Sequence, residues 1–507
     1  MQQLLRTLVI ALALALAGGA PASSQTLTVA VATGPASLDP HAATDAGHLA
    51  AMKHVYDPLL WLGDTLQIEP RLAEGWRTVD ATTWEFKLRS GVTFHDGTAL
   101  SAGDVAFSIE RQKTAGGMPA LQNLKEVKIV APNLVHVVTT RPEPRLAAEF
   151  TRLFIVSRAA FASHGRPVGT GPYRLGSWSA GADLVLERFD GYWGAKEPWQ
   201  THVRKIVPDP AVRLDLIRQG AVDVIADIAG ADVAAVREAP GLSVLTTDLP
   251  QLVSLDLDLR ERPVGITGPK GMAFDKNPFR EHRVRIAVDL ALDRATIAEG
   301  VLKGLAKPAN QMAIRALAGF NRTLPPRPFH AAAARKLLAE AGYPDGFGLT
   351  LHAPVPLTAI VEAIGRQLGD IGIEARIITM PVEAFQAAQA RGEHGVTLSQ
   401  TVIGDGDTWA TLATLAHSRT GTPAIGGLNG LGHGNPRLDR LIDDAAMEGA
   451  ATKRKALLEE ANAVWARDVQ RLPVVSLGSA WAMARDRLKL TPQASGETLA
   501  MSIRPAR

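Results

Sequence analysis

Short apolar runs mark the strands that the chain is expected to form. The run over 27–32 (LTVAVA) predicts a buried strand, and the alternation of apolar with charged residues over 84–88 predicts a half-buried one. Similar runs over 134–140 and 182–189 predict two more strands. The first half of the chain is therefore expected to be rich in β-structure.

In the second half, helical and strand patterns alternate. One apolar helix face is indicated over 284–292, and helices are predicted over 331–341 and 359–368. Each of the last two precedes a short apolar strand, over 349–352 and 375–379. This alternation favours an α/β lobe. The segment over 262–278, rich in Pro, Gly and Lys and without periodicity, is predicted to cross between lobes.

Residues 1–22 have the pattern of a cleaved secretory signal peptide. Arg6 gives the N-terminal region its positive charge, and an unbroken apolar run covers 8–17. Small residues at 20 and 22 match the pattern of a signal-peptidase cleavage site. The run is shorter than the roughly 20 residues that a membrane-spanning helix needs. We therefore expect an exported chain that is soluble in the periplasm after cleavage.

Composition narrows the class of protein further. The chain has 507 residues and no cysteine, so disulfides and a lipid-anchored cleavage site are both ruled out, and stability must come from burial. Lys and Arg number 54 against 51 Asp and Glu, spread without blocks. Such a balance offers no electrostatic footprint for nucleic acid.

Motifs of known catalytic chemistry are absent from the sequence. It contains no Cys nucleophile, no His-Glu dipeptide, no Gly-Lys pair and no Gly-x-Ser-x-Gly elbow. The 13 histidines are scattered, which predicts no dedicated metal site and no cofactor. We expect a binding protein and not an enzyme, with a periplasmic hydrolase or transferase that uses an unrecognised constellation of carboxylates left as an alternative.

Several sequence blocks together carry a family resemblance. In chain order they include 38–41 (LDPH), 55–59 (VYDPL), 69–76 (EPRLAEGW), 86–97 (FKLRSGVTFHDG), 104–108 (DVAFS), 169–173 (GTGPY), 192–194 (YWG), 337–344 (LLAEAGYP) and 434–439 (GNPRLD). On these blocks the chain resembles solute-binding protein family 5, the periplasmic oligopeptide-, dipeptide- and nickel-binding components of ABC importers. The resemblance runs from about residue 27 to the C-terminus.

The resemblance implies a two-lobed α/β periplasmic binding protein fold of class II, with an extra subdomain and a ligand cleft between the lobes. Lobe I would comprise 23–55, 175–265 and 476–507, and the subdomain within it 56–174. Lobe II would comprise 270–475. In the 169–173 block, Gly169 and Gly171 are expected to need positive φ.

Family position also indicates where the ligand would bind. The loop after the first strand, with Gly34, Ala36 and Ser37, matches a segment that lines the cleft in relatives with backbone groups, although a plain turn is the alternative. Extended peptides are held there through main-chain hydrogen bonds.

The second candidate segment is the loop over 404–409. Its position matches an acidic loop that pairs with a ligand amine in relatives, so Asp405 or Asp407 could meet an ammonium while Trp409 stacks on the ligand. A solvated Asp-Gly turn is the alternative. In the Gly-rich loop over 422–435, Asn429 is the side chain best suited to binding.

The sequence also departs from the peptide-binding pattern at two places. Val402 stands near the position of the amine-pairing Asp, and no Arg follows the strand ending at His352, where the residues are 353–357 (APVPL). A free peptide C-terminus would lack a guanidinium partner there. The resemblance therefore implies a peptide-like ligand that is blocked, larger or less zwitterionic than a dipeptide.

The expected function is the substrate-binding subunit of an ABC importer, a monomer that closes on a peptide or peptide-like small ligand and delivers it to membrane permease subunits. Binding of a nickel chelate or another non-peptide solute is an alternative, with His417 or His433 as the candidate residues for contact with the metal. A ligand sensor that docks on a receptor is a further alternative, because it needs only the same cleft closure.

Overall fold

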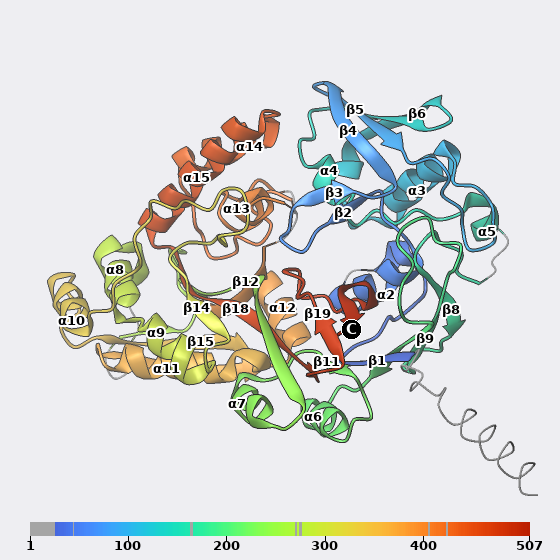
Figure 1. Ribbon diagram of the computed structural model, residues 1–507. Coiled ribbons are helices and arrows are strands. Elements are labelled where there is room, and N and C mark those ends of the chain that lie inside the picture. Colours follow the sequence, from blue (N-terminus) through green and yellow to red (C-terminus); the bar gives the residue numbers. More distant parts are fainter. Residues whose placement is uncertain are drawn as a thin grey trace, which may run out of the picture.

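The computed structural model describes residues 26–43, 45–162, 166–268, 271–272, 276–403, 406–421 and 424–506. The predicted signal peptide, 1–22, lies outside the described residues. Within these ranges, no helix combines the length and the apolar character that crossing a membrane requires. The two halves of the molecule lie on either side of a pair of long strands (Figure 1).

A mixed sheet of 12 strands extends through both halves. Its first-lobe strands are β1 (Thr26–Val31), β8 (Tyr173–Ser177), β9 (Leu184–Arg188), β10 (Thr201–Ile206) and β11 (Val224–Ile225). Its second-lobe strands are β13 (Ile266–Thr267), β14 (Ala306–Pro308), β15 (Phe347–Pro354), β16 (Ile373–Met380) and β17 (Val396–Val402). β1 pairs in parallel with β10 and β11, while β15 pairs in parallel with β16 and β17.

The two remaining strands, β12 (Leu242–Asp256) and β18 (Arg471–Ala484), connect the lobes. They pair with each other in antiparallel fashion over most of their length. The second half of β12 pairs with β17, whereas β18 pairs with β14 toward the second lobe and with β11 in the first. The register of β12 against β18 shifts between Asp248 and Leu252. A second shift follows between Val253 and Ser254. A bulge bends a strand, and the bend of β12 next to Asp248, between the lobes, is called here the hinge.

The buried apolar residues form separate cores on the two sides. In the second lobe, one face of the sheet is covered by α8 (His282–Ala291), α10 (Ala331–Glu340) and α11 (Thr358–Gly369), and a second cluster lies under α13 (Trp409–Leu415), α14 (Pro436–Met447) and α15 (Ala451–Asp468). In the first lobe, α2 (Ala46–Val55) packs with β1. A further core joins α3 (Ala102–Ala115) to the four-stranded sheet of β4 (Ala73–Asp80), β5 (Thr83–Leu88), β6 (Leu124–Ala131) and β7 (Leu134–Thr139).

The predicted elements are confirmed, with small differences at their ends. The strands expected over 27–32, 84–88, 134–140 and 182–189 are β1, β5, β7 and β9, and the helices expected in the second half are α8, α10 and α11. The crossing between the lobes comes earlier than the sequence predicted. β12 already pairs with β17 at Gln251, and Ile266 and Thr267 form an edge strand against β15. The residue bounds of the lobes stay a prediction.

The expectation of positive φ at Gly169 and Gly171 is wrong, because neither residue is among those with left-handed backbone. The reason for glycine is space. A Cβ at Gly169 would lie 2.0 Å from the carbonyl oxygen of Val55, and one at Gly171 would lie 2.5 Å from that of His54. The block is therefore needed for close packing of the chain against the end of α2.

Candidate functional site

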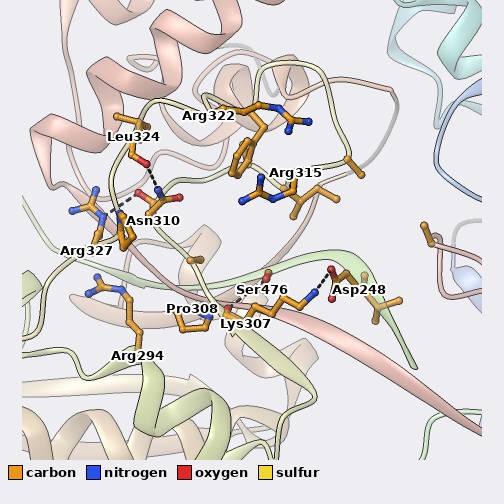
Figure 2. Close-up of a pocket in the computed structure, with 18 of the residues that line it drawn as sticks. Asp248, Arg294, Lys307, Pro308, Asn310, Arg315, Arg322, Leu324, Arg327 and Ser476 are labelled. Carbon is orange, nitrogen blue, oxygen red and sulfur yellow. Dashed lines mark hydrogen bonds and ion pairs between the residues drawn. The ribbon is translucent and has the colours of Figure 1, made fainter. Parts of the chain in front are cut away.

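A cavity of about 510 Å³ lies beside the hinge, lined by residues of both lobes. Asp248 and Leu249 reach it from the bulge of β12. The first lobe contributes Leu66, from the turn between β2 (Leu60–Leu62) and β3 (Ile68–Pro70), and the C-terminal segment contributes Ala494. The rest of the lining comes mainly from the chain that follows β14, called here the 309–327 loop (Figure 2).

Two amide side chains, one half-buried and one buried, fix the shape of the 309–327 loop. Asn310 donates its Nδ2 hydrogen to the carbonyl oxygen of Leu324 over 2.9 Å. Gln311, which is almost fully buried, donates to the carbonyl oxygen of Asn321 and accepts from the Asn321 backbone N–H, each over 2.9 Å. Because the two ends of the loop are tied together by these bonds, its other side chains project from a fixed frame.

Ion pairs hold the walls of the cavity at its base. The Lys307 ammonium lies 2.7 Å from a carboxylate oxygen of Asp248, which ties β14 to the bulge of β12. Asp289 of α8 accepts from the guanidinium groups of both Arg294, at 2.5 Å, and Arg327. Burial lowers the pKa of Arg294, and the neighbouring Asp289 opposes that shift. One carboxylate thus serves two cations.

The predicted cleft loop after β1 follows directly from the carboxyl end of that strand. Gly34 packs closely on β10, because a Cβ there would lie 2.7 Å from Cδ1 of Ile206. Ala36 is exposed, and the Ser37 hydroxyl accepts from the Asp39 backbone N–H over 3.3 Å. None of these residues is among those lining the cavity beside the hinge. Their contact with ligand stays a prediction.

The 404–409 loop is only partly described, and Asp405 lies outside the described residues. Asp407 uses both carboxylate oxygens within the chain. One accepts from the Trp409 backbone N–H over 2.9 Å, and the other lies 2.7 Å from Nε of Arg454 on α15. The Trp409 indole N–H donates to the carbonyl oxygen of Ile442 over 2.9 Å, and its ring faces the guanidinium of Arg145 from the first lobe at 5.0 Å. Asp407 and Trp409 therefore organise the loop and its contact with the first lobe.

Asn429 is buried and fastens its own loop. Its Nδ2 donates to the carbonyl oxygens of His417 and His433, and its Oδ1 accepts from the His433 backbone N–H. Burial lowers the pKa of His433 to about 4, so this ring is neutral at neutral pH. His417 lies 3.4 Å from Asp443. Within the described ranges no cluster of three or more His, Asp or Glu side chains could hold a metal ion.

A second cavity, of about 670 Å³, opens at the carboxyl ends of β15 and β17. In open α/β sheets this edge is the usual place for a ligand crevice. Val402, Pro354 and Pro356 line it, so both departures from the peptide-binding pattern fall on one surface. Every lining residue belongs to the second lobe or to β18. Burial lowers the pKa of His394 in its wall to about 4, which leaves that ring uncharged at neutral pH.

Sequence reasoning missed the residues around the first cavity. Arg315, Arg322 and Arg327 stand in a loop that contains no acidic residue between 309 and 327, and this imbalance was a usable signal. Leu66 and Asp248 carried no such signal, because their place beside the loop depends on pairing between distant strands.

Comparison with known proteins identifies the family. The model for bacterial extracellular solute-binding proteins, family 5 (middle region), matches residues 67–423. The chain belongs to this family. It is 27% identical to the glutathione-binding protein of Salmonella typhi over 473 residues, which cover 88% of each chain. It is 28% identical to the dipeptide-binding protein of Escherichia coli K12 over 402 residues, 71% of this chain and 72% of that one.

Solved structures of solute-binding proteins share the fold. The structure of NikA from Brucella suis in complex with Fe(III)-EDTA superposes with a TM-score of 0.82 at 22% identity, covering 95% of this chain and 99% of that one. DppA from Helicobacter pylori in complex with the peptide STSA superposes with a TM-score of 0.75 at 22% identity, covering 95% and 98%. The predicted two-lobed fold is confirmed, and so is the role of a bacterial extracellular solute-binding protein.

Proposed function

We propose that this chain captures a peptide or peptide-like small molecule in the cavity beside the hinge and presents it, as a monomer, to the permease subunits of an ABC importer. The observation that carries the proposal is a cavity lined by both lobes at the point where β12 bends. A ligand that touches both lobes has more contacts when they are closed than when they are open. Its binding therefore shifts the population toward the closed form.

The size of the cavity and the relatives both support a small ligand. About 510 Å³ lies within the range of about 300–1,000 Å³ that small-molecule sites usually have. The relatives that match over most of the chain are named for binding glutathione and dipeptides. The second cavity offers little to a simple zwitterionic dipeptide, because Val402 and the proline-rich end of β15 supply neither an acid for its amine nor a guanidinium for its carboxylate.

Native mass spectrometry of protein purified from the periplasm tests the ligand class. We expect a fraction of the molecules to carry one bound organic molecule of a few hundred daltons, released on denaturation and fragmenting as a peptide or amide. A bound metal chelate, or a ligand without amide bonds, would contradict the peptide-like assignment while leaving the solute-binding role intact.

We further propose that the chain reaches the periplasm through cleavage after Ala22, without a lipid anchor. The small residues at 20 and 22 and the absence of cysteine support this. N-terminal sequencing of the mature protein is expected to begin at or within a few residues of Ser23. A periplasmic form that keeps Met1 would contradict it.

A further inference from the structure

The cavity beside the hinge is strongly cationic. Five of its lining residues carry positive side chains and one carries a carboxylate; the cations are Arg294, Lys307, Arg315, Arg322 and Arg327, and the acid is Asp248. Asp289 supplies a second carboxylate from behind the wall. These two acids balance only part of the charge, so an excess of positive charge faces the cavity.

Arg315 and Arg322 hold the uncompensated charge. Among the described residues, neither guanidinium has a carboxylate within 4.0 Å, and both side chains are exposed. The neighbour identified for Arg315 is the ring of Phe320, whose centroid lies 5.4 Å from its guanidinium carbon. Lys307, Arg294 and Arg327 differ from them, because all three are already paired.

These two free guanidinium groups share one wall of the cavity. Figure 2 shows Arg315 and Arg322 on the side formed by the 309–327 loop, across from Lys307, Asp248 and Ser476 on the strands. Their loop is held by the bonds of Asn310 and Gln311, which do not involve either arginine. The loop itself therefore needs little further ordering when a ligand binds, and the remaining cost lies in ordering the two exposed arginine side chains.

The remaining wall favours an amphipathic molecule. Leu66, Leu249, Ile314 and Ala494 present apolar surface to the same space. A guanidinium group binds a carboxylate through two parallel hydrogen bonds, and a cleft with low-dielectric walls concentrates its field. Two guanidinium groups on one loop, without a carboxylate partner among the described residues and beside an apolar wall, are thus complementary to a compact molecule with an apolar body and more than one acidic group.

We propose that this cavity selects an acidic ligand, a peptide-like molecule with at least two carboxylates, and that Arg315 and Arg322 determine this specificity. The inference rests on the proposed function, since it assigns the charge of the ligand that the two lobes capture. It also accounts for the missing acid near Val402 and the missing arginine after β15. Neither is needed when the ligand is held through carboxylates on the 309–327 loop.

Isothermal titration calorimetry with matched probes tests this. The probes are glutamyl-glutamate, its uncharged-side-chain counterpart glutaminyl-glutamine, and propane-1,2,3-tricarboxylate, which has no amide bond. We expect glutamyl-glutamate to bind at least about tenfold more tightly than glutaminyl-glutamine. In the double variant Arg315→Gln/Arg322→Gln that ratio is expected to fall to within about twofold, with glutaminyl-glutamine binding unchanged.

Arg237→Gln is the matched control, because Arg237 is an exposed arginine at the end of α7 (Gly230–Glu238) and does not line the cavity. It is expected to keep the wild-type ratio. Thermal melts of all variants check folding, which the exposed positions of Arg315 and Arg322 should preserve.

The outcomes separate this inference from the proposed function. Equal binding of the two dipeptides by the wild type overturns the acidic specificity and leaves peptide capture standing. Arginine-dependent binding of the tricarboxylate without binding of either dipeptide supports the anion site and contradicts the peptide-like ligand. A preference for glutamyl-glutamate that survives in the double variant overturns the assignment to Arg315 and Arg322. Failure of all three probes to bind overturns the inference.

Discussion

The 404–409 loop and the 309–327 loop lie side by side, joined by a bridge between Ala318 and Asp407, yet they use their charged side chains in opposite ways. In the first, Asp407 is held by Arg454 and by the start of α13. In the second, Arg315 and Arg322 project into the cavity without a carboxylate partner among the described residues.

This difference shows why a charged loop residue cannot be assigned to a ligand from its position alone. The sequence resemblance indicated Asp407 as a candidate ligand-pairing acid, but its carboxylate meets a buried guanidinium from α15. Removing one partner of such a pair leaves an uncompensated buried charge. Arg315 and Arg322 have no carboxylate partner among the described residues and can meet a ligand, whereas Arg327 of the same loop is paired with Asp289. Whether a charged side chain is available to a ligand depends on its partners within the chain and not on the composition of its loop.

The largest expected effect comes from Asp407→Ala, because it strands the buried Arg454 and removes the hydrogen bond to Trp409. We expect a loss of about 3–5 kcal/mol in the free energy of unfolding, measured by chemical denaturation. Asp444→Ala, at an exposed acid on the neighbouring helix, is the control and should change it by less than about 0.5 kcal/mol. Unchanged stability with lost ligand binding would show that Asp407 serves the ligand after all.

The next effect concerns Leu66, which brings the first lobe into the apolar cluster beneath both loops. Its side chain is 5% exposed and packs in the same cluster as Ala309, Met312 and Ile403. We expect Leu66→Ala to weaken this packing by about 2–3 kcal/mol, seen as a lower melting temperature. Leu428→Ala, at a leucine that is 62% exposed, should leave the melt unchanged. Equal melting temperatures for both variants would mean that the turn between β2 and β3 does not stabilise the two loops.

A smaller effect is expected for Trp409→Phe. The change removes the indole hydrogen bond to Ile442 while keeping an aromatic ring near Arg145, and should cost about 1 kcal/mol of stability. Trp178→Phe is a matched control, since the Trp178 indole N–H has no hydrogen-bond partner within the described residues. Ligand affinity should stay within about twofold of wild type. A tenfold loss of affinity without loss of stability would place the Trp409 ring on the ligand.

The smallest effect on stability is expected at Arg315 and Arg322. Because both are exposed and have no carboxylate partner in the part of the chain that the structure describes, Arg315→Gln and Arg322→Gln should each change the free energy of unfolding by less than about 0.5 kcal/mol. Denaturation curves of the single variants check this. A loss beyond about 1.5 kcal/mol would mean that the guanidinium is used within the chain, as that of Arg454 is.

Much of the fold could be predicted because its signals are local. The apolar runs of β1 and β7 and the spacing along α8 and α11 report burial directly, and the structure confirms them. The hinge could not be found in this way. It depends on a register shift at Asp248 inside one long strand, whereas the Pro- and Gly-rich segment that suggested a crossing contains an edge strand at Ile266.

The site was harder to predict than the fold because its geometry depends on contacts between distant residues. Asp407 and Arg454 meet across the packing of α13 on α15, and Lys307 meets Asp248 only after β14 has paired with β18. Asn429 lies in a Gly-rich loop, where nothing in the sequence indicates its partners. In the structure its buried side chain donates to the carbonyl oxygens of His417 and His433 and so stabilises that loop. That any of the candidate residues contacts the ligand stays a prediction, and Asp405 lies outside the described residues; the others are Gly34, Ala36, Ser37, Asp407, Trp409 and Asn429.

The central claim, capture of a ligand by closure of two lobes about the bulge in β12, is tested most directly by small-angle scattering. The radius of gyration is measured without ligand and at saturation with a ligand whose binding calorimetry has established. The account predicts a smaller radius with ligand, explained by rotation of the lobes as rigid bodies. An unchanged radius at saturation would contradict hinge closure.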